Sequence, residues 1–244
     1  MMKNFKAAMF DFDGTVTEKG QYAPPKVLAD CLVDLSQRVP IGFCTGRQLE
    51  SFQKHGLDEL LREIDFAKRN SFLQNLFLFA ENGAIGYDFN TEKEVFEEFY
   101  RVEWPENFMV KEDLKAILRE AIKDYGDVYD NAHRVVVVMR TNLHNTEGRD
   151  MNEVYAISEK LYEITNEILR KISPDFEKHL HVGNSGIGVI VGPANGDKDQ
   201  AIKRFGELLT GLRGMNFEPN FRDILVVGDS PQIGGNDHYF LRGE

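Results

Sequence analysis

Two acidic residues stand one residue apart in the run DFDGT at positions 11–15, directly after the apolar segment 7–10. A free carboxylate has a pKa of about 3.9, so Asp11 is ionised at neutral pH and can attack phosphorus without a separate base. A neighbouring carboxyl group such as Asp13 can carry a proton to and from the leaving group. The spacing therefore favours a nucleophile and an acid-base partner, although an Asp-Gly pair is also common in turns with solvated acids.

A second group of polar residues, Thr45, Gly46 and Arg47, follows the apolar segment 41–44. Where a strand runs into the start of a helix, free backbone N–H groups can bind phosphate, and a threonine hydroxyl adds a donor. Thr45 has an alternative explanation as an ordinary helix N-cap.

Two more charged positions complete the set. Lys198 can hold the negative charge of Asp11 and of a phosphate together, because opposite charges attract strongly at short range; a plain surface lysine is the alternative. Asp229 follows the apolar segment 224–227, and Asn236 and Asp237 lie in the loop beyond it. Magnesium prefers oxygen ligands, so Asp11, Asp229 and a backbone carbonyl would form an incomplete shell around Mg²⁺. A solvated aspartate at a helix start is the alternative for Asp229.

These residues can act together only if the fold gathers them. Ligands collect outside the carboxyl ends of the strands in an open parallel sheet. Apolar runs alternate with segments of helical spacing in both end regions of the chain: we expect strands at 7–10, 39–44, 76–80 and 224–227, and helices at 26–37, from 48 onwards and at 199–209. This alternation predicts an α/β fold with a doubly wound, Rossmann-like parallel sheet.

The middle of the chain has a different order of predicted helices and strands. A hairpin at 84–89 and 94–100 precedes helices and strands in mixed order, expected at 111–125, 134–140, 151–172, 179–182 and 187–191. This order predicts a small α+β unit inserted into the first domain. We expect a discontinuous core domain at 1–86 and 193–244, and an inserted cap domain at 87–192.

Charge and composition limit the classes of molecule that the protein is expected to bind. The 244 residues carry a formal net charge of −11, which repels nucleic acid and anionic lipid, so neither is expected as a partner. No segment approaches the ~20 apolar residues of a membrane helix. The start of the chain lacks the long apolar core of a signal peptide, and two cysteines, Cys31 and Cys44, are too few for a metal cluster. A cytoplasmic location and a small-molecule substrate are the expectation.

Taken together, the four motifs resemble those of the haloacid dehalogenase superfamily of phosphohydrolases: DFDGT at 11–15, Thr45, Lys198, and Gly228-Asp229 with Asn236 and Asp237. The resemblance covers about half of the chain, and the first motif is its most specific part. The position of the insertion resembles the subfamily with an α/β C2-type cap, as does the Glu81-Asn82-Gly83-Ala84 run. The fourth motif, with its spaced Gly-Gly-Asn-Asp-His, is similar to eukaryotic-type phosphomannomutases.

The resemblance implies a role for each motif residue. Asp11 would be the nucleophile that forms an aspartyl phosphate, and Asp13 the general acid and then the base. Thr45, with Gly46 and Arg47, would bind the substrate phosphate, and Lys198 would balance charge. Asp229, Asp11 and the carbonyl of Asp13 would bind Mg²⁺, with Asn236 and Asp237 in support.

The activity that this implies is a Mg²⁺-dependent phosphatase for a small phosphorylated metabolite, above all a sugar phosphate. Two alternatives remain. One is a phosphosugar mutase, against which stand Ile190 at a position where the mutases usually carry an acid and the partial Arg-Asn-Gly motif at 140–142. The other is a non-catalytic phospho-ligand binding module. Only seven residues follow Asp237, fewer than the family's last strand and helix need, so we expect a pared-down core or a shortened chain.

Overall fold

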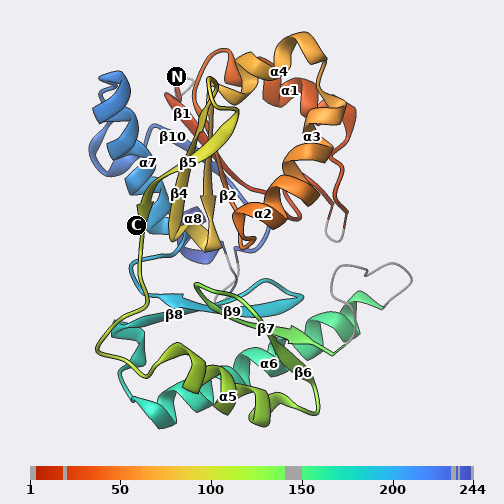
Figure 1. Ribbon diagram of the computed structural model, residues 1–244, viewed down its shortest axis with the longest axis vertical. Helices are drawn as coiled ribbons and strands as arrows, with labels where there is room; N and C mark the ends of the chain where they lie inside the picture. The colour runs from red at the N-terminus through yellow and green to blue at the C-terminus, as the bar shows by residue number, and fades with distance from the viewer. Residues whose placement is uncertain (1–3, 19–20, 141–149, 232–234, 236, 243–244) are drawn as a thin grey trace.

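The computed structural model describes residues 4–18, 21–140, 150–231, 235 and 237–242. Within these residues the chain forms two sheets that lie one above the other (Figure 1), a six-stranded sheet near both chain ends and a four-stranded sheet built from the middle of the chain. The α/β fold expected from the sequence, with a parallel sheet and an inserted unit, is confirmed.

The six-stranded sheet has the order β10-β1-β2-β3-β4-β5. Its first four strands, β10 (Ile224–Val227), β1 (Ala7–Asp11), β2 (Ile41–Cys44) and β3 (Leu76–Ala80), are parallel. The side chains of β1, β2 and β3 are almost all buried, as expected for strands that are covered on both faces, whereas β10 at the edge of the sheet is partly buried. The four parallel strands stand where the apolar runs predict them.

The hairpin expected at the start of the inserted unit belongs instead to the first sheet. Strand β4 (Ile85–Asn90) pairs antiparallel with β3, and β5 (Val95–Arg101) pairs with β4. The first sheet therefore continues, through β4 and β5, as far as residue 101. We place the second unit at residues 103–195, so its start differs from the expected residue 87.

The two connections between the units lie against each other. On one connection, Val102 N donates a hydrogen bond to Ala84 O at 2.8 Å. On the other, a Cβ added at Gly196 would come within 2.9 Å of Ala84 Cβ and 3.3 Å of Val102 Cβ. Figure 1 shows both connections running down the same side of the molecule.

Helices cover both faces of the first sheet (Figure 1). One face carries α1 (Lys26–Ser36), α2 (Leu49–Phe52), α3 (Asp58–Glu63) and α4 (Phe66–Leu73), which pack around an apolar cluster containing Phe12, Phe43 and Phe52. A π-helical turn at Gln53–Leu57 joins α2 to α3. The other face carries α7 (Lys198–Arg213) and α8 (His238–Arg242), with Phe79 and Phe205 in its cluster. The covered sheet is the doubly wound core that the alternation predicts.

The second unit is an antiparallel sheet backed by two helices. Its strands have the order β6-β7-β9-β8: β6 (Gly126–Tyr129), β7 (Val135–Met139), β9 (Gly188–Pro193) and β8 (Leu180–Asn184). The helices α5 (Lys111–Ile122) and α6 (Met151–Ile172) lie below the sheet in Figure 1, and none of the described helices covers the face of this sheet toward the first unit. Among the described residues, no helix has the length and apolar character needed to span a bilayer.

Candidate active site

The carboxyl ends of β10, β1 and β2 meet at the edge of the first sheet that faces the second unit. Asp11 at the end of β1 pairs in register with Cys44 at the end of β2, and Phe10 pairs with Val227 at the end of β10. The segments that follow these strands must therefore begin side by side. This register brings Asp11, Thr45 and Asp229 together from three distant parts of the sequence.

Lys198, the first residue of α7, lies beneath this edge between two carboxylates. Its Nζ donates to Asp11 Oδ1 and to Asp237 Oδ1, the latter at 2.6 Å. All three side chains are buried. Although burial acts to lower it, the two carboxylates hold the pKa of Lys198 above its usual value, so the ammonium stays charged. Burial raises the pKa of the Asp11 carboxyl, while the charge of Lys198 opposes the rise.

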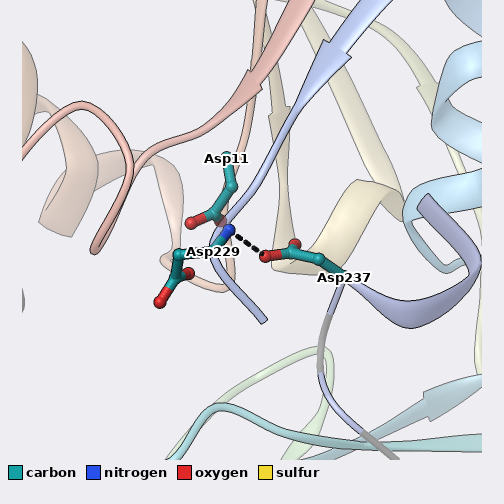
Figure 2. A group of neighbouring side chains, drawn as sticks. All are labelled: Asp11, Asp229 and Asp237. Atoms are coloured by element: carbon teal, nitrogen blue, oxygen red, sulfur yellow. Dashed lines mark hydrogen bonds between the residues drawn. The ribbon is translucent and has the colours of Figure 1, made fainter. Parts of the chain in front are cut away.

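Asp11, Asp229 and Asp237 form a group of carboxylates that fits a metal ion (Figure 2). One oxygen of each lies within 4.8 Å of the others. Gly14, at φ +94°, leaves the space that Asp229 occupies, because a Cβ there would lie 2.7 Å from Asp229 Oδ2. Hard oxygen donors of this kind suit Mg²⁺.

Both carboxylate oxygens of Asp237 have hydrogen-bond partners within the protein. Oδ1 accepts from Lys198, and Oδ2 accepts from the backbone N–H groups of Asp229 and Ser230 at 3.0 Å each. Asp237 therefore holds Lys198 and the start of the Asp229 loop in place. The sequence predicts Asp11 and Asp229 as metal ligands, and both lie beside Asp237 in the lining of the cleft.

Asp13 is held at the mouth of the site by the segment after β2. Arg47 Nε donates to Asp13 Oδ2 at 3.0 Å, and Arg47 Nη2 donates to Asp13 Oδ1. The Thr45 hydroxyl donates to Asp13 Oδ2 at 3.3 Å and accepts from Arg47 N at 3.2 Å. Thr45 is fully buried, so it supports Asp13 and the Arg47 backbone from below, whereas Gly46 and Arg47 line the cleft.

A turn that directly follows β3 supports the same segment. Glu81 and Asn82 both have left-handed backbone conformations, at φ +56° and +60°, which are unusual for residues other than glycine. In this turn Glu81 N donates to Arg47 O at 3.0 Å and Asn82 N donates to Thr45 O at 2.8 Å. The strained turn thus fixes the backbone on either side of Gly46.

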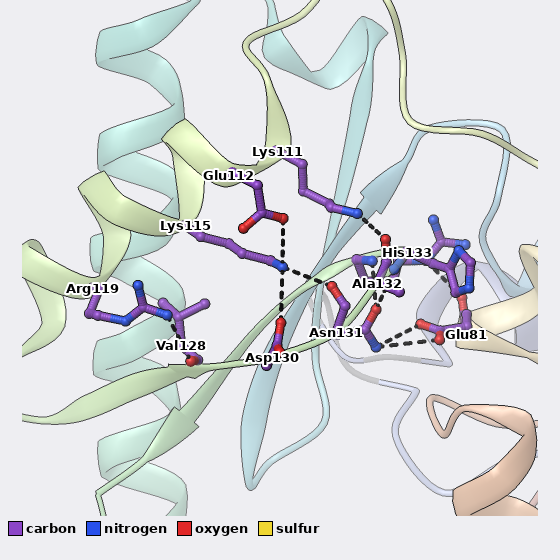
Figure 3. Close-up of polar contacts among 11 residues, drawn as sticks. Glu81, Lys111, Glu112, Lys115, Arg119, Val128, Asp130, Asn131, Ala132 and His133 are labelled. Atoms are coloured by element: carbon purple, nitrogen blue, oxygen red, sulfur yellow. Dashed lines mark hydrogen bonds and ion pairs between the residues drawn. The ribbon is translucent and has the colours of Figure 1, made fainter.

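Glu81 also joins the first unit to the second, through residues that the sequence analysis did not single out. Asn131 Nδ2 donates to both carboxylate oxygens of Glu81 at 3.1 and 3.3 Å (Figure 3), and Arg134 Nε donates to Glu81 O at 3.2 Å. Burial raises the pKa of Glu81, while Arg134 and the Asn131 hydrogen bond oppose the rise. Arg134 is 1% exposed, and its Nη1 and Nη2 have no hydrogen-bond partner among the described residues. A buried arginine beside a buried glutamate is the main electrostatic link between the units.

A cleft of about 240 Å³ opens between the two sheets at this point. From the first unit it is lined by Asp11, Asp13, Arg47 and Asp229, together with Tyr22, Gln48 and Ser51. From the second unit it is lined by residues of β6, β7 and β9 and by Ser185. Acidic groups, a guanidinium and the Gly46 backbone therefore meet on one wall of a ligand-sized cavity.

The remaining candidates lie in different places. Asp237 joins the site as described, whereas Asn236 falls outside the described residues. Two further polar residues of the second unit, Asn184 and Arg140, do not line the cleft, and Asn184 is buried, with its Oδ1 accepting from Ser158 at 2.7 Å. The structure thus brings Asp11, Asp13, Thr45, Gly46, Arg47, Lys198, Asp229 and Asp237 to one place.

Similar folds occur among solved structures of phosphate-releasing enzymes. A mutant of the Plasmodium falciparum IMP-nucleotidase with IMP bound matches with a TM-score of 0.65 at 19% identity, over 97% of this chain and 62% of that one. The C-terminal domain of the C. albicans trehalose-6-phosphate phosphatase matches with a TM-score of 0.57 at 16% identity, over 83% and 62%. The Synechocystis sucrose-phosphatase, in complex with sucrose and phosphate, matches with a TM-score of 0.55 at 17% identity, over 98% and 80%.

At these identities the similarity shows the fold alone. The chain spans about 62% of the length of the IMP-nucleotidase. No protein-family model matches the chain, and no curated protein matches it.

Proposed function

We propose that this chain is a phosphohydrolase of the haloacid dehalogenase type, acting on the phosphomonoester of a small metabolite. The observation that carries the proposal is the buried contact of Lys198 with Asp11 and Asp237, beside the carboxylate of Asp229. Burying a lysine between two acids costs desolvation energy. A function that uses a fixed, charged nucleophile accounts for that cost.

In the first step an oxygen of Asp11 attacks phosphorus and forms an aspartyl phosphate while the bond from phosphorus to the ester oxygen breaks. Asp13, at the mouth of the cleft, gives a proton to the departing oxygen. Arg47 and the Gly46 backbone would face the phosphoryl oxygens from the wall of the cleft, and Lys198 offsets negative charge from below.

In the second step Asp13 takes a proton from a water molecule that attacks the same phosphorus. The bond from phosphorus to Asp11 then breaks, and inorganic phosphate leaves with Asp11 restored. The second unit covers the cleft and would limit the access of bulk water during the first step. Asp13 therefore serves as the acid in the first step and as the base in the second.

Asp11 and Asp229, with the backbone carbonyl of Asp13, would hold Mg²⁺, as the oxygen-rich site suggests. When bound, the ion neutralises charge on the phosphoryl oxygens. A positive ion next to Asp11 also favours the ionised form of a carboxyl group whose pKa burial raises.

The sequence favours a sugar phosphate as the substrate and hydrolysis as the reaction. Phosphosugar mutase activity is the alternative. The folds similar to this one include an enzyme named for IMP as well as two named for sugar phosphates, so hydrolysis of small phosphomonoesters is what they have in common. Glucose 1-phosphate separates the alternatives, because a mutase converts it to the 6-phosphate and a phosphatase releases free phosphate.

The test of the proposed function is phosphate release from 4-nitrophenyl phosphate with Mg²⁺ present. The wild-type chain should turn over, and Asp11→Asn should lose activity by a factor of ~10³ or more, since the amide cannot serve as nucleophile. Asp30→Asn is the matched control because Asp30 is exposed on α1. Activity retained in Asp11→Asn, or absent from wild type, contradicts the proposal.

A further inference from the structure

The two walls of the cleft differ sharply in chemistry. The first unit contributes the charged groups, together with Gln48, Ser51 and the ring of Tyr22. Tyr22 lies with its ring centroid 5.4 Å from the Arg47 guanidinium and 4.8 Å from the ring of His55. Polar contacts for a ligand are therefore concentrated at the phosphate end.

The wall from the second unit is apolar because of the way its strands alternate. Along β7, Val135, Val137 and Met139 pack into the cluster above α5 and α6, so Val136 and Val138 point to the opposite face. Both of these valines are half-buried and line the cleft. This aliphatic surface lies on the face of the sheet that none of the described helices covers.

Strands β9 and β6 extend the same surface. Val189 and Val191 pack into the cluster of the second unit, which turns Ile190 toward the first unit. A Cβ added at Gly46 would come within 2.8 Å of Ile190 Cδ1, so Ile190 lies directly over the phosphate-binding segment. At the other end Tyr129 of β6 lines the cleft with 56% of its surface exposed.

Two polar side chains on this wall, those of Asn131 and Ser185, already have hydrogen-bond partners within the protein. Asn131 uses its amide nitrogen on Glu81, and its Oδ1 accepts from the backbone N–H groups of His133 and Arg134 at 2.7 Å each. The Ser185 hydroxyl donates to Gly188 O at 3.0 Å. Within the described part of the second unit, the lining of the cleft carries no charged side chain.

We infer that the substrate's leaving group is uncharged and carries a flat apolar ring, which packs against Val136, Val138 and Tyr129. The chemistry is that of a nucleoside monophosphate or an aryl phosphomonoester. This inference rests on the proposed function, since the phosphate end defines the direction in which the leaving group points. It departs from the sugar phosphate that the sequence favours.

The physical reason is the hydrogen-bonding balance of the wall. A hexose would bring several hydroxyl groups against valine and isoleucine, where they lose water without gaining partners. A flat ring buries its apolar faces against the same side chains and loses little hydration. The hydroxyls of a ribose, if present, would lie nearer the phosphate, on the side of Gln48 and Ser51.

The experiment compares adenosine 5′-monophosphate with ribose 5-phosphate, which carries a hydroxyl group at C1 in place of the adenine ring. 4-Nitrophenyl phosphate represents the aryl phosphomonoesters. We expect the wild-type kcat/KM for the nucleotide to exceed that for ribose 5-phosphate by roughly tenfold to a hundredfold. The ratio should fall towards one in Val136→Asn/Val138→Asn. It should be unchanged in Val27→Asn, the same substitution at a valine of α1 that is 71% exposed.

Binding measurements separate this inference from the proposed function. Calorimetric titration of Asp11→Asn with the nucleotide and with ribose 5-phosphate measures the affinity of the cleft for each ligand without hydrolysis. Tighter binding of the nucleotide supports the inference. The inference is overturned, even when the phosphatase activity is real, if ribose 5-phosphate binds and reacts as well as both the nucleotide and 4-nitrophenyl phosphate. A preference for 4-nitrophenyl phosphate without one for the nucleotide assigns the ring to an aryl phosphate.

Discussion

Arg47 binds the carboxylate of Asp13 at two points, with its Nε donating to Oδ2 at 3.0 Å and its Nη2 donating to Oδ1. The same guanidinium also donates from Nη1 to His55 O at 2.6 Å, so its plane is fixed. A paired arginine of this kind is specific in geometry as well as charge. Arg47 therefore orients the proposed acid-base group besides lining the phosphate end of the cleft.

Replacing Arg47 with alanine should lower kcat by roughly tenfold to a hundredfold, because the orientation of Asp13 is lost. The loss should be greater for an alkyl phosphate, whose leaving oxygen needs a proton, than for 4-nitrophenyl phosphate. Arg47→Lys should restore little, since an ammonium cannot bind a carboxylate at two points. Steady-state kinetics with both substrates measure this. Arg62→Ala, at an exposed position of α3, is the control, and equal losses on the two substrates would show that Arg47 acts on the phosphate alone.

Breaking the link between Arg134 and Glu81 should cost stability. Arg134→Met removes the hydrogen bond to Glu81 O and leaves the Glu81 carboxylate buried without its cationic neighbour, which should cost on the order of 1–3 kcal/mol. Glu81→Gln in the same chain removes the unpaired charge and should recover part of that loss. Urea unfolding of the single and double variants gives the free energies. A strictly additive double variant would contradict the link.

Stability should fall as the pH is lowered from 6.5 to about 4, in part because of His181. Burial lowers the pKa of His181 from 6.5 to about 4, while Asp199 acts to raise it and Arg134 to lower it, and Asp197 Oδ2 lies 3.5 Å from its Nδ1. Between pH 6.5 and pH 4 the histidine binds a proton in the unfolded chain but not in the folded chain. Lowering the pH therefore stabilises the unfolded state and lowers the free energy of unfolding. The effect is on the order of 1–3 kcal/mol, discounted for the partial exposure of the ring.

The measurement is the difference in unfolding free energy between pH 7 and pH 4.5. His181→Gln should make this difference smaller than in the wild type, because the glutamine side chain does not titrate. If the wild type and the variant lose the same stability over this range, the burial of His181 is not a source of the acid sensitivity.

Removal of divalent cations should abolish phosphate release, and Mg²⁺ should restore it. Asp229→Asn should raise the Mg²⁺ concentration for half-maximal activity by roughly tenfold or more, because a charged ligand is lost. Asp237→Asn should instead lower the unfolding free energy, since Asp237 holds Lys198 and two backbone N–H groups. Activity titrations and urea unfolding separate the two effects. An unchanged Mg²⁺ requirement in Asp229→Asn contradicts the assignment of this ligand.

The parallel strands and the gathering of Asp11, Lys198 and Asp229 could be predicted because buried strands are continuous apolar runs whose ends carry polar residues. The pairing of the hairpin with the first sheet could not be predicted, for a related reason. Strand β5 has a mixed burial pattern, which indicates a strand but not the neighbour with which it pairs. Strand β6 was missed because only two of its four residues are buried, too few to show a period.

The link through Arg134 could not be predicted from the sequence. An arginine beside four valines reads as the polar end of a strand, and its partner Glu81 is 53 residues away. Nor could the sequence show that Thr45 is buried under Asp13 instead of lining the cleft, since a threonine after a strand suits both positions. In each case the role of the residue depends on a neighbour in three dimensions, and this neighbour cannot be identified from spacing along the chain.

Because Gly196 lies against Val102, the whole second unit is joined to the first sheet at one place. Exchange of the segment between them, by recombination or by design, would graft a new wall onto an unchanged set of reacting groups. In such a scaffold the substrate preference can change with the second unit while the proposed reacting groups of the first unit stay the same.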